Sequence, residues 1–466
     1  VMDEVHHGGA ATYQKVLDYF TPQFLLGMTA TPERSDDFDI YALFHHQIAY
    51  EIRLHDALAE NMLVPFHYHG VCEITVNGEV LDDNSDFSAL TCEERVRHIL
   101  YYADLYGSDT DRVKGLVFCR SVDEARTLAA AFRAHGRRAL ALTGASSEGE
   151  RQAAIDHLEA DADQDRDYLD YIFTCDIFNE GVDIPQVNQV IMLRPTTSAI
   201  VFVQQLGRGL RKYPYKRYLE VLDFIGNYEN NFLLPIALFG DRTYDKDFVR
   251  TLMQTNFLPG PTSVHFDDIA KERIYAAIDK KRSLADLDDL KNAYRDMACR
   301  LGRQPMMMDF VRFGDKDPML FIAKKDSFYA FSQYMEPSPS TLNDAHRAVL
   351  KMMSLELANG KRIEEILILR HLLAEPSWST ADLAAETERL YGFLPSTETM
   401  NHAARLLTLQ FFVKTAQQKY GGMPLISFEQ HTYATTPYFE ALKENAEFTA
   451  YVDDILDYGT YRFETL

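Results

Sequence analysis

Five short apolar stretches in the middle of the chain decide its fold: KGLVFC (114–119), RALALTG (138–144), YIFTC (171–175), QVIMLR (189–194) and YLEVLDFIG (218–226). Each is a nearly continuous run of apolar residues, which is typical of strands whose sheet is covered by helices on both faces. Most of them are separated by segments with helical spacing, at 93–106, 122–135, 148–159 and 198–210. This alternation predicts a doubly wound α/β domain with a parallel sheet.

The same patterns divide the chain into three parts. Residues 1–66 read as fragments of strand and helix, and 67–240 contain the alternating pattern, with a hairpin signal at Asn77-Gly78. Beyond residue 240 strand signals are sparse, and helical spacing recurs at 341–359, 362–374, 380–391 and 398–409. We therefore predict part of a first α/β lobe (1–66), a complete second lobe (67–240) and a mostly helical domain (245–466).

Composition narrows the class of protein. Of the 466 residues, 46% are hydrophobic and 25% are charged, as in ordinary soluble proteins. No apolar run reaches the ~18–20 residues of a membrane helix, so we expect no membrane contact. Five cysteines without a Cys-x-x-Cys pair fit a reducing cytoplasm. A net charge of −23 argues against a generic polyanion binder, so evidence for nucleic acid must come from motifs.

An acidic pair stands at the start of the chain, in VMDEVHH (1–7). At the carboxyl end of a parallel strand, Asp3 would hold Mg²⁺ on nucleotide phosphates and Glu4 would orient the attacking water. Taken alone, the tetrapeptide Asp3-Glu4-Val5-His6 is weak evidence, because a strand-end acidic pair without a role is common.

A second motif makes the first more specific. The stretch GMTATPER (27–34) follows after about 25 residues and brings Thr29 and Thr31 to a strand end. Their hydroxyls could bond the acidic motif and a neighbouring domain. An ordinary turn rich in threonine and proline is the alternative for this stretch alone.

A third motif, TCDIFNEGVDIP (174–185), follows an apolar strand. Gly181 permits a close backbone approach, Asp183 could hold a ribose hydroxyl or an arginine, and Thr174 could meet a nucleic-acid phosphate. A simple strand-to-loop turn explains the stretch about equally well.

The fourth motif is QQLGRGLR (204–211), in which Arg208 and Arg211 are three residues apart and lie on one helix face. Arginine carries a permanent charge on a planar fork, so both could reach a γ-phosphate across a cleft. The Gln-x-x-Gly-Arg-x-x-Arg spacing, with Gln204 and Gly207, makes a merely solvated helix face a poor explanation.

In order, DEVH, TAT, LVFCRS, Thr143-Gly144, EGVDIP and QQLGRGLR resemble motifs II to VI of the superfamily 2 helicases and translocases. The resemblance implies two RecA-like lobes, ATP and Mg²⁺ between them, and nucleic acid across both. It gives Asp3, Glu4, Arg208 and Arg211 the catalytic roles. It assigns coupling to His6, Thr29, Thr31 and Gln204, nucleotide contact to Gly181, Asp183 and Gly207, and nucleic-acid contact to Arg120, Thr143, Gly144 and Thr174.

The chain departs from this family in one respect. No Gly-x-x-x-x-Gly-Lys-[Ser/Thr] loop occurs, and Gly360-Lys361 is followed by Arg362. We therefore expect the C-terminal part of an ATPase, which hydrolyses ATP scarcely without its N-terminal part. The run VLDFIGNYENNFLLPIAL (221–238) and the tail around LGRQPMMMDF (301–310) resemble bacterial helicases with a C-terminal domain of unknown function. In those proteins a phospholipase-D-like nuclease domain often precedes the helicase.

Other interpretations stay open. The resemblance favours DNA over RNA, with nuclease, defence or repair partners. A non-catalytic recognition module of such a complex is the alternative function. A zinc site at His67, His69 and Cys72 is disfavoured by its spacing. In the tail, 380–394 followed by 396–409 could form a helix-turn-helix, although a plain helical packing module is favoured because the second helix is not notably basic.

Overall fold

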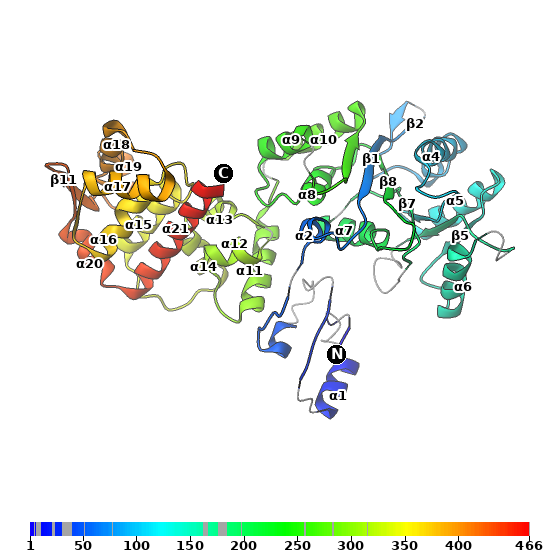
Figure 1. Ribbon diagram of the computed structural model, residues 1–466, viewed down its shortest axis with the longest axis horizontal. Helices are drawn as coiled ribbons and strands as arrows, with labels where there is room; N and C mark the ends of the chain where they lie inside the picture. The colour runs from blue at the N-terminus through cyan, green and yellow to red at the C-terminus, as the bar shows by residue number, and fades with distance from the viewer. Residues whose placement is uncertain are drawn as a thin grey trace. The chain divides into compact units, whose positions relative to one another are not determined.

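The computed structural model describes residues 1–3, 5, 11–20, 24–29, 40–50, 52–76, 78–161, 166–175, 184–196, 198–255, 258–281, 284–314 and 316–465. The chain divides into two units of different architecture (Figure 1). The first unit comprises 1–36 and 47–284, and the second comprises 37–46 and 285–466.

The first unit is built on a seven-stranded sheet in the order β5-β6-β4-β7-β8-β1-β9. Every pairing in it is parallel. The strands are β1 (Phe66–Cys72), β4 (Gly115–Phe118), β5 (Ala139–Leu142), β6 (Tyr171–Thr174), β7 (Gln189–Met192), β8 (Leu219–Ile225) and β9 (Ser263–Phe266). The predicted parallel α/β sheet is therefore confirmed.

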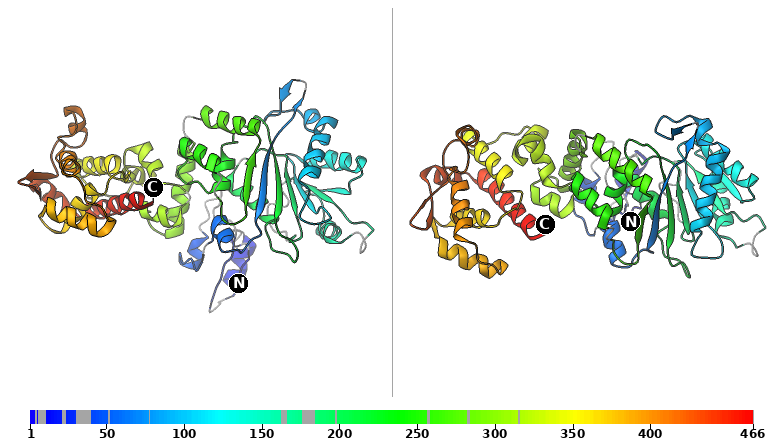
Figure 2. Two further views of the ribbon diagram at one scale, coloured as in Figure 1. Left: turned by 45° about the horizontal axis from the view of Figure 1, so that its top comes forward. Right: turned by 90° about the horizontal axis from the view of Figure 1, so that it is seen from above.

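Helices cover both faces of this sheet, as Figure 2 shows. Successive residues of a strand point to opposite faces, and β4 illustrates the result. Val117 packs with helices α4 and α5, whereas Leu116 and Phe118 belong to the core with α6, α7, α8, α9 and α10. The helices are α4 (Glu93–Tyr106), α5 (Val122–Ala134), α6 (Glu148–Glu159), α7 (Ala199–Arg208), α8 (Leu233–Phe239), α9 (Lys246–Thr255) and α10 (Asp268–Lys280).

The sheet continues beyond the predicted second lobe, because β9 follows residue 240 in the sequence. β1 pairs with β8 along its whole length, from Phe66 opposite Leu219 to Cys72 opposite Ile225. β9 adds a further parallel strand beside β1. The first unit consequently runs to residue 284, and 245–284, which the sequence pattern assigned to the helical domain, lie with the sheet.

Smaller elements complete the first unit. They are α1 (Ala11–Tyr19), α2 (Leu54–Ala59), α3 (Phe87–Leu90) and the hairpin β2 (Thr75–Val76) with β3 (Glu79–Val80). The hairpin forms where Asn77-Gly78 predicted it, and Gly78 has a φ of 85°, which its lack of a side chain permits.

The second unit is mostly helical, as predicted. Its helices are η2 (Tyr41–Phe44), α11 (Leu287–Leu301), α12 (Met307–Phe313), α13 (Pro318–Lys325), α14 (Phe328–Met335), α15 (Asp344–Glu356), α16 (Glu364–Ala374), α17 (Thr380–Tyr391), α18 (Thr397–Leu407), α19 (Lys414–Lys419), α20 (Pro437–Lys443) and α21 (Ala446–Thr465). It also contains a small antiparallel sheet in the order β10 (Ser377–Ser379), β12 (Thr432–Thr435) and β11 (Ile426–Glu429). Sequence spacing gave no sign of this sheet.

No helix in the described parts of the chain is both long enough and apolar enough to cross a bilayer.

Candidate nucleotide and nucleic-acid site

Three of the four residues expected to contact nucleic acid meet at the carboxyl edge of the sheet. Phe118 in β4, Leu142 in β5 and Thr174 in β6 lie in register across adjacent strands. Thr143 follows β5 directly and Arg120 stands two residues after the end of β4, so both backbones emerge at the same edge as Thr174. Open parallel sheets bind their ligands at this edge.

The Thr174 side chain is fully buried. Its backbone carbonyl accepts a hydrogen bond from Cys119 N at 2.8 Å, which extends the pairing of β4 and β6 by one residue. Its hydroxyl finds no hydrogen-bond partner among the described residues. A buried hydroxyl without a hydrogen-bond partner lowers stability, so the Thr174 hydroxyl does not itself stabilise the lobe through a bond to another described residue.

Thr143 and Gly144 form the turn after β5. Thr143 N donates to Ser146 Oγ at 3.1 Å, and Arg151 Nη2 donates to Gly144 O at 3.2 Å. Gly144 is exposed, and no atom lies within 4 Å of the position that a Cβ would take. The backbone of this turn is therefore open to a ligand, whereas the Thr143 side chain is buried.

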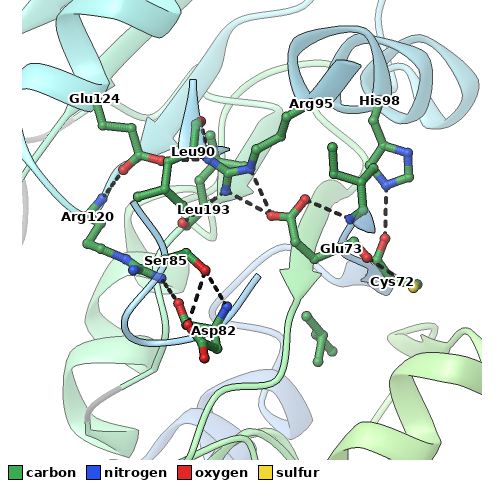
Figure 3. Close-up of polar contacts among 12 residues, drawn as sticks. Cys72, Glu73, Asp82, Ser85, Leu90, Arg95, His98, Arg120, Glu124 and Leu193 are labelled. Atoms are coloured by element: carbon green, nitrogen blue, oxygen red, sulfur yellow. Dashed lines mark hydrogen bonds and ion pairs between the residues drawn. The ribbon is translucent and has the colours of Figure 1, made fainter. Parts of the chain in front are cut away.

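Arg120 is held by the protein itself (Figure 3). Its guanidinium donates to the backbone carbonyls of Asp82 at 2.9 Å and Asp83 at 3.2 Å, and lies 5.7 Å from the Tyr228 ring centroid. Its own backbone N–H donates to Glu124 at 2.7 Å. A phosphate at this position would have to compete with the loop that Arg120 anchors.

A buried ionic network lies under this edge, and the sequence patterns gave no sign of it. Arg95 in α4 donates to Glu73 after β1 and to Glu124 in α5, and all three side chains are buried (Figure 3). Burial alone would lower the pKa of the Arg95 guanidinium, but the two carboxylates outweigh it and hold that pKa above its ordinary value. Because Glu124 also accepts from Arg120 N, the network fixes the backbone of that motif residue.

The last motif lies on α7 and the turn after it. Phe202 and Leu206 are buried in the core, while Gln204 and Arg208, four residues apart, are half-buried. Arg211 follows the helix and is exposed. The prediction that Arg208 and Arg211 share one helix face is therefore wrong, because α7 ends at Arg208 and Arg211 lies in the turn beyond it.

The two glycines of this motif differ in their surroundings. A Cβ on Gly209 would lie 2.5 Å from Leu219 Cδ1, so close packing of this turn on β8 requires glycine. A Cβ on Gly207 would meet no atom within 4 Å, so packing gives no reason for glycine there.

The acidic motif and the threonine motif lie on neighbouring strand segments. Met2 and Gly27 form a parallel bridge, with Met2 N donating to Leu26 O at 2.7 Å and Met28 N donating to Met2 O at 2.9 Å. Asp3 and Thr29 follow these bridge residues by one and two positions, at the same end of the pair. Glu4, His6, Thr31, Gly181 and Asp183 lie outside the described residues.

The disfavoured zinc site has another explanation in the structure. His67 Nδ1 and His69 Nε2 lie 3.0 Å and 2.7 Å from the two carboxylate oxygens of Glu220. His98 Nε2 lies 2.9 Å from the carbonyl oxygen of Cys72. Among the described residues, no group of three or more His, Cys, Asp or Glu side chains has the arrangement of a metal site.

Comparison with known families agrees with this geometry. Residues 95–213 match the helicase conserved C-terminal domain, and residues 1–34 match the res subunit of type III restriction enzymes. The chain carries the second RecA-like lobe of a superfamily 2 helicase. The resemblance drawn from the ordered motifs is therefore confirmed. Residues 290–465 match a domain of unknown function, DUF8090, in the expected C-terminal position.

Three curated relatives are each similar to about half of the chain. A 51.5 kDa protein of a Lactococcus phage is 26% identical over 231 residues, which are 49% of this chain and 49% of the relative. The predicted ATP-dependent helicase IRC3 of Saccharomyces cerevisiae is 24% identical, over 53% of this chain and 37% of the relative. The type I restriction enzyme EcoAI endonuclease subunit of Escherichia coli is 24% identical, over 48% of this chain and 31% of the relative. The chain thus spans half or less of these relatives.

Proposed function

We propose that the chain is the C-terminal portion of an ATP-dependent motor that translocates on or unwinds nucleic acid. The observation that carries the proposal is the meeting of Arg120, Thr143 and Thr174 at one edge of a parallel sheet. That edge belongs to the segment that matches the helicase C-terminal domain. ATP hydrolysis between two lobes would open and close them and so step this edge along a strand.

The nucleotide roles follow from the chemistry of the residues. Asp3 is an exposed carboxylate at a strand end, the type of oxygen ligand that Mg²⁺ takes, and Glu4 beside it would orient water. Arg208 and Arg211 would stabilise the charge that develops on the transferred phosphoryl group. Gly207 has open space where a side chain would stand, which suits a close approach by a phosphate. ATP with Mg²⁺, when bound, supplies the phosphoanhydride that is hydrolysed.

DNA is the favoured track. The chain is similar to a type III restriction enzyme subunit and to a type I restriction enzyme subunit. Restriction enzymes act on DNA. Partners that are nucleases or that act in defence or repair would suit a motor that works on DNA.

The chain by itself should be a poor ATPase. Its 466 residues contain no phosphate-binding loop of the Gly-x-x-x-x-Gly-Lys-[Ser/Thr] type, whose backbone N–H groups and lysine hold the β- and γ-phosphates. The same observation favours the second candidate function, a non-catalytic recognition module of a defence or repair complex.

The test is ATP hydrolysis by the gene product extended by its upstream coding sequence, with variants Arg208→Ala and Arg211→Ala. Arg126→Ala serves as the control, because Arg126 is an exposed arginine of α5 outside every motif. The motor predicts DNA-stimulated turnover that falls by about 10³-fold or more in the Arg208 variant and persists in the control. DNA-independent turnover, or equal rates in all variants, would refute it.

A further inference from the structure

Residues 364–435 fold into a helix-turn-helix with a wing, an arrangement that the charge of the second helix did not favour. The order of elements is α16, β10, α17, α18, β11, β12, with the short α19 inserted before β11 (Figure 1). The first strand of this module, β10, pairs with the last, β12, and β12 pairs with β11. Gln430 and His431, with φ of 46° and 62°, form the two-residue turn between β11 and β12, as a tight hairpin requires.

Buried residues and hydrogen bonds hold the module together. α16 contacts both α17 and α18, and α18 contacts β11. The hydroxyl of Tyr433 in β12 donates to Met400 O in α18 at 3.1 Å, and Leu425 N donates to Leu407 O at 3.1 Å. Thr380 N, at the start of α17, donates to His431 O in the wing at 2.9 Å. These bonds fix α18 relative to the wing.

The second helix of the motif, α18, presents a polar exposed face. Ala403, Ala404, Leu406 and Leu407 are buried. Thr397, Glu398, Asn401 and Arg405 are exposed, with the last two four residues apart. In a helix-turn-helix this helix enters the major groove, and asparagine and arginine are side chains that read base edges there.

The charge around α18 differs from that of the whole chain. The chain has 70 acidic and 47 basic residues, yet residues 390–428 contain one acidic side chain, Glu398, and three basic ones, Arg405, Lys414 and Lys419. Burial lowers the pKa of His402 in α18, and the positive charges of Arg362 and Arg405 lower it further. A segment that is poor in acidic residues and weakly basic, on a strongly acidic protein, suits contact with a polyanion.

We propose that this module binds double-stranded DNA, with α18 in the major groove and Arg405 and Asn401 as principal contacts. This proposed DNA-binding surface is distinct from the sheet edge of the helicase lobe. The proposal does not depend on the motor function. It would hold a duplex while the lobe engages a strand. Exposed Leu394, Phe411 and Val413 lie before and after α18 and would suit a protein partner, which a duplex-binding experiment separates from DNA.

The experiment measures binding of the 466-residue chain to a labelled duplex of mixed sequence by fluorescence anisotropy, over a range of salt. Arg405→Ala should weaken duplex binding about tenfold and reduce the slope of log affinity against log salt by about one. Glu398→Gln should strengthen binding, because it removes the carboxylate from the exposed face of α18. Single-stranded DNA of the same sequence should bind the parent and the Arg405 variant equally.

Arg347→Ala is the matched control. Arg347 lies in α15 of the same unit, is exposed and pairs with Asp344 at 3.6 Å. Its variant should bind the duplex like the parent. Tighter duplex binding by Glu398→Gln cannot come from misfolding, so this variant tests the proposal even if Arg405→Ala disturbs the fold. Duplex binding unchanged in both α18 variants would overturn the proposal and favour a protein partner for this face. Equal losses in the Arg405 and Arg347 variants would overturn it as well.

Discussion

The guanidinium of Arg95 donates from Nε and Nη2 to one carboxylate oxygen of Glu73, at 3.0 Å and 2.8 Å, with both side chains fully shielded from water. A third bond runs from Nη1 to Glu124 Oε1 at 2.7 Å. The pairs join the end of β1 to α4 and α5, three segments that meet beneath the candidate nucleic-acid edge.

Arg95→Leu should lower the free energy of unfolding of the first unit by about 3–5 kcal/mol, because it leaves two carboxylates buried without a cation. Urea denaturation measures the loss. The control is Arg97→Leu on the same helix, where a 71% exposed guanidinium pairs with Glu93 on the surface and should contribute little. Equal losses in the two variants would show that the network is not a stabilising feature.

Asp223 in β8 should make stability depend on pH. Burial raises its pKa to about 7 from an ordinary value of 3.8, while a hydrogen bond from the Tyr68 hydroxyl at 2.7 Å opposes the shift. The folded state therefore keeps a proton that the unfolded chain releases, so stability is present below pH 3.8 and is lost as pH rises toward 7. Asp223→Asn cannot titrate and still accepts from Tyr68.

We expect the free energy of unfolding of the parent to fall, relative to that of Asp223→Asn, between about pH 4.5 and about pH 7.5. These two pH values lie within about a unit of the unfolded and folded pKa values of Asp223, respectively. Chemical denaturation at both pH values gives the comparison, and other titrating groups cancel between the proteins. Parallel pH profiles for parent and variant would contradict the raised pKa.

Gly209→Ala should destabilise the protein by about 1–3 kcal/mol, because its Cβ would stand 2.5 Å from Leu219 Cδ1, where the turn after α7 packs on β8. Gly207→Ala, two residues earlier, meets no atom within 4 Å and lies in a helix, where alanine is favoured over glycine. Thermal unfolding should place the Gly209 variant well below the parent and the Gly207 variant at or above it. The reverse order would show that the turn after α7 does not pack on β8 in this way.

Thr174→Val separates a structural role from a binding role. The buried hydroxyl has no hydrogen-bond partner among the described residues, so an apolar side chain of similar shape should leave the free energy of unfolding unchanged or higher. If the hydroxyl serves a nucleic-acid phosphate when the lobe engages a strand, single-stranded DNA should bind the variant more weakly. A variant that is less stable and binds DNA normally would assign Thr174 to packing alone.

The sequence was enough to predict the parallel sheet and the helical C-terminal part. Buried parallel strands are continuous apolar runs, and the helices of the tail repeat their apolar spacing over three or more turns. β9 was missed, and so was the place of β1 in the parallel sheet, because the strands that pair with them are distant in sequence. Phe66 pairs with Leu219, and no local pattern encodes a partner so far along the chain. The wing was missed because strands of three or four residues are too short to show alternation.

The candidate site could be predicted only in part. Ordered motifs indicated Arg120, Thr143 and Thr174, and their meeting at one edge follows from parallel register. Arg95, Glu73 and Glu124 could not be found, because a charged residue that is buried by tertiary packing looks like any surface charge in the sequence. The holding of Arg120 by the backbone of Asp82 and Asp83 was equally invisible, since backbone acceptors carry no residue signature.

The most direct test of the motor is steady-state ATP hydrolysis, with and without DNA, by the 466-residue chain beside the gene product extended by its upstream coding sequence. Glu4→Gln in the extended protein is the variant that isolates the proposed chemistry. The motor predicts that only the extended protein turns over, that DNA stimulates it and that Glu4→Gln abolishes it. Turnover by the 466-residue chain alone, or turnover that survives Glu4→Gln, would contradict it.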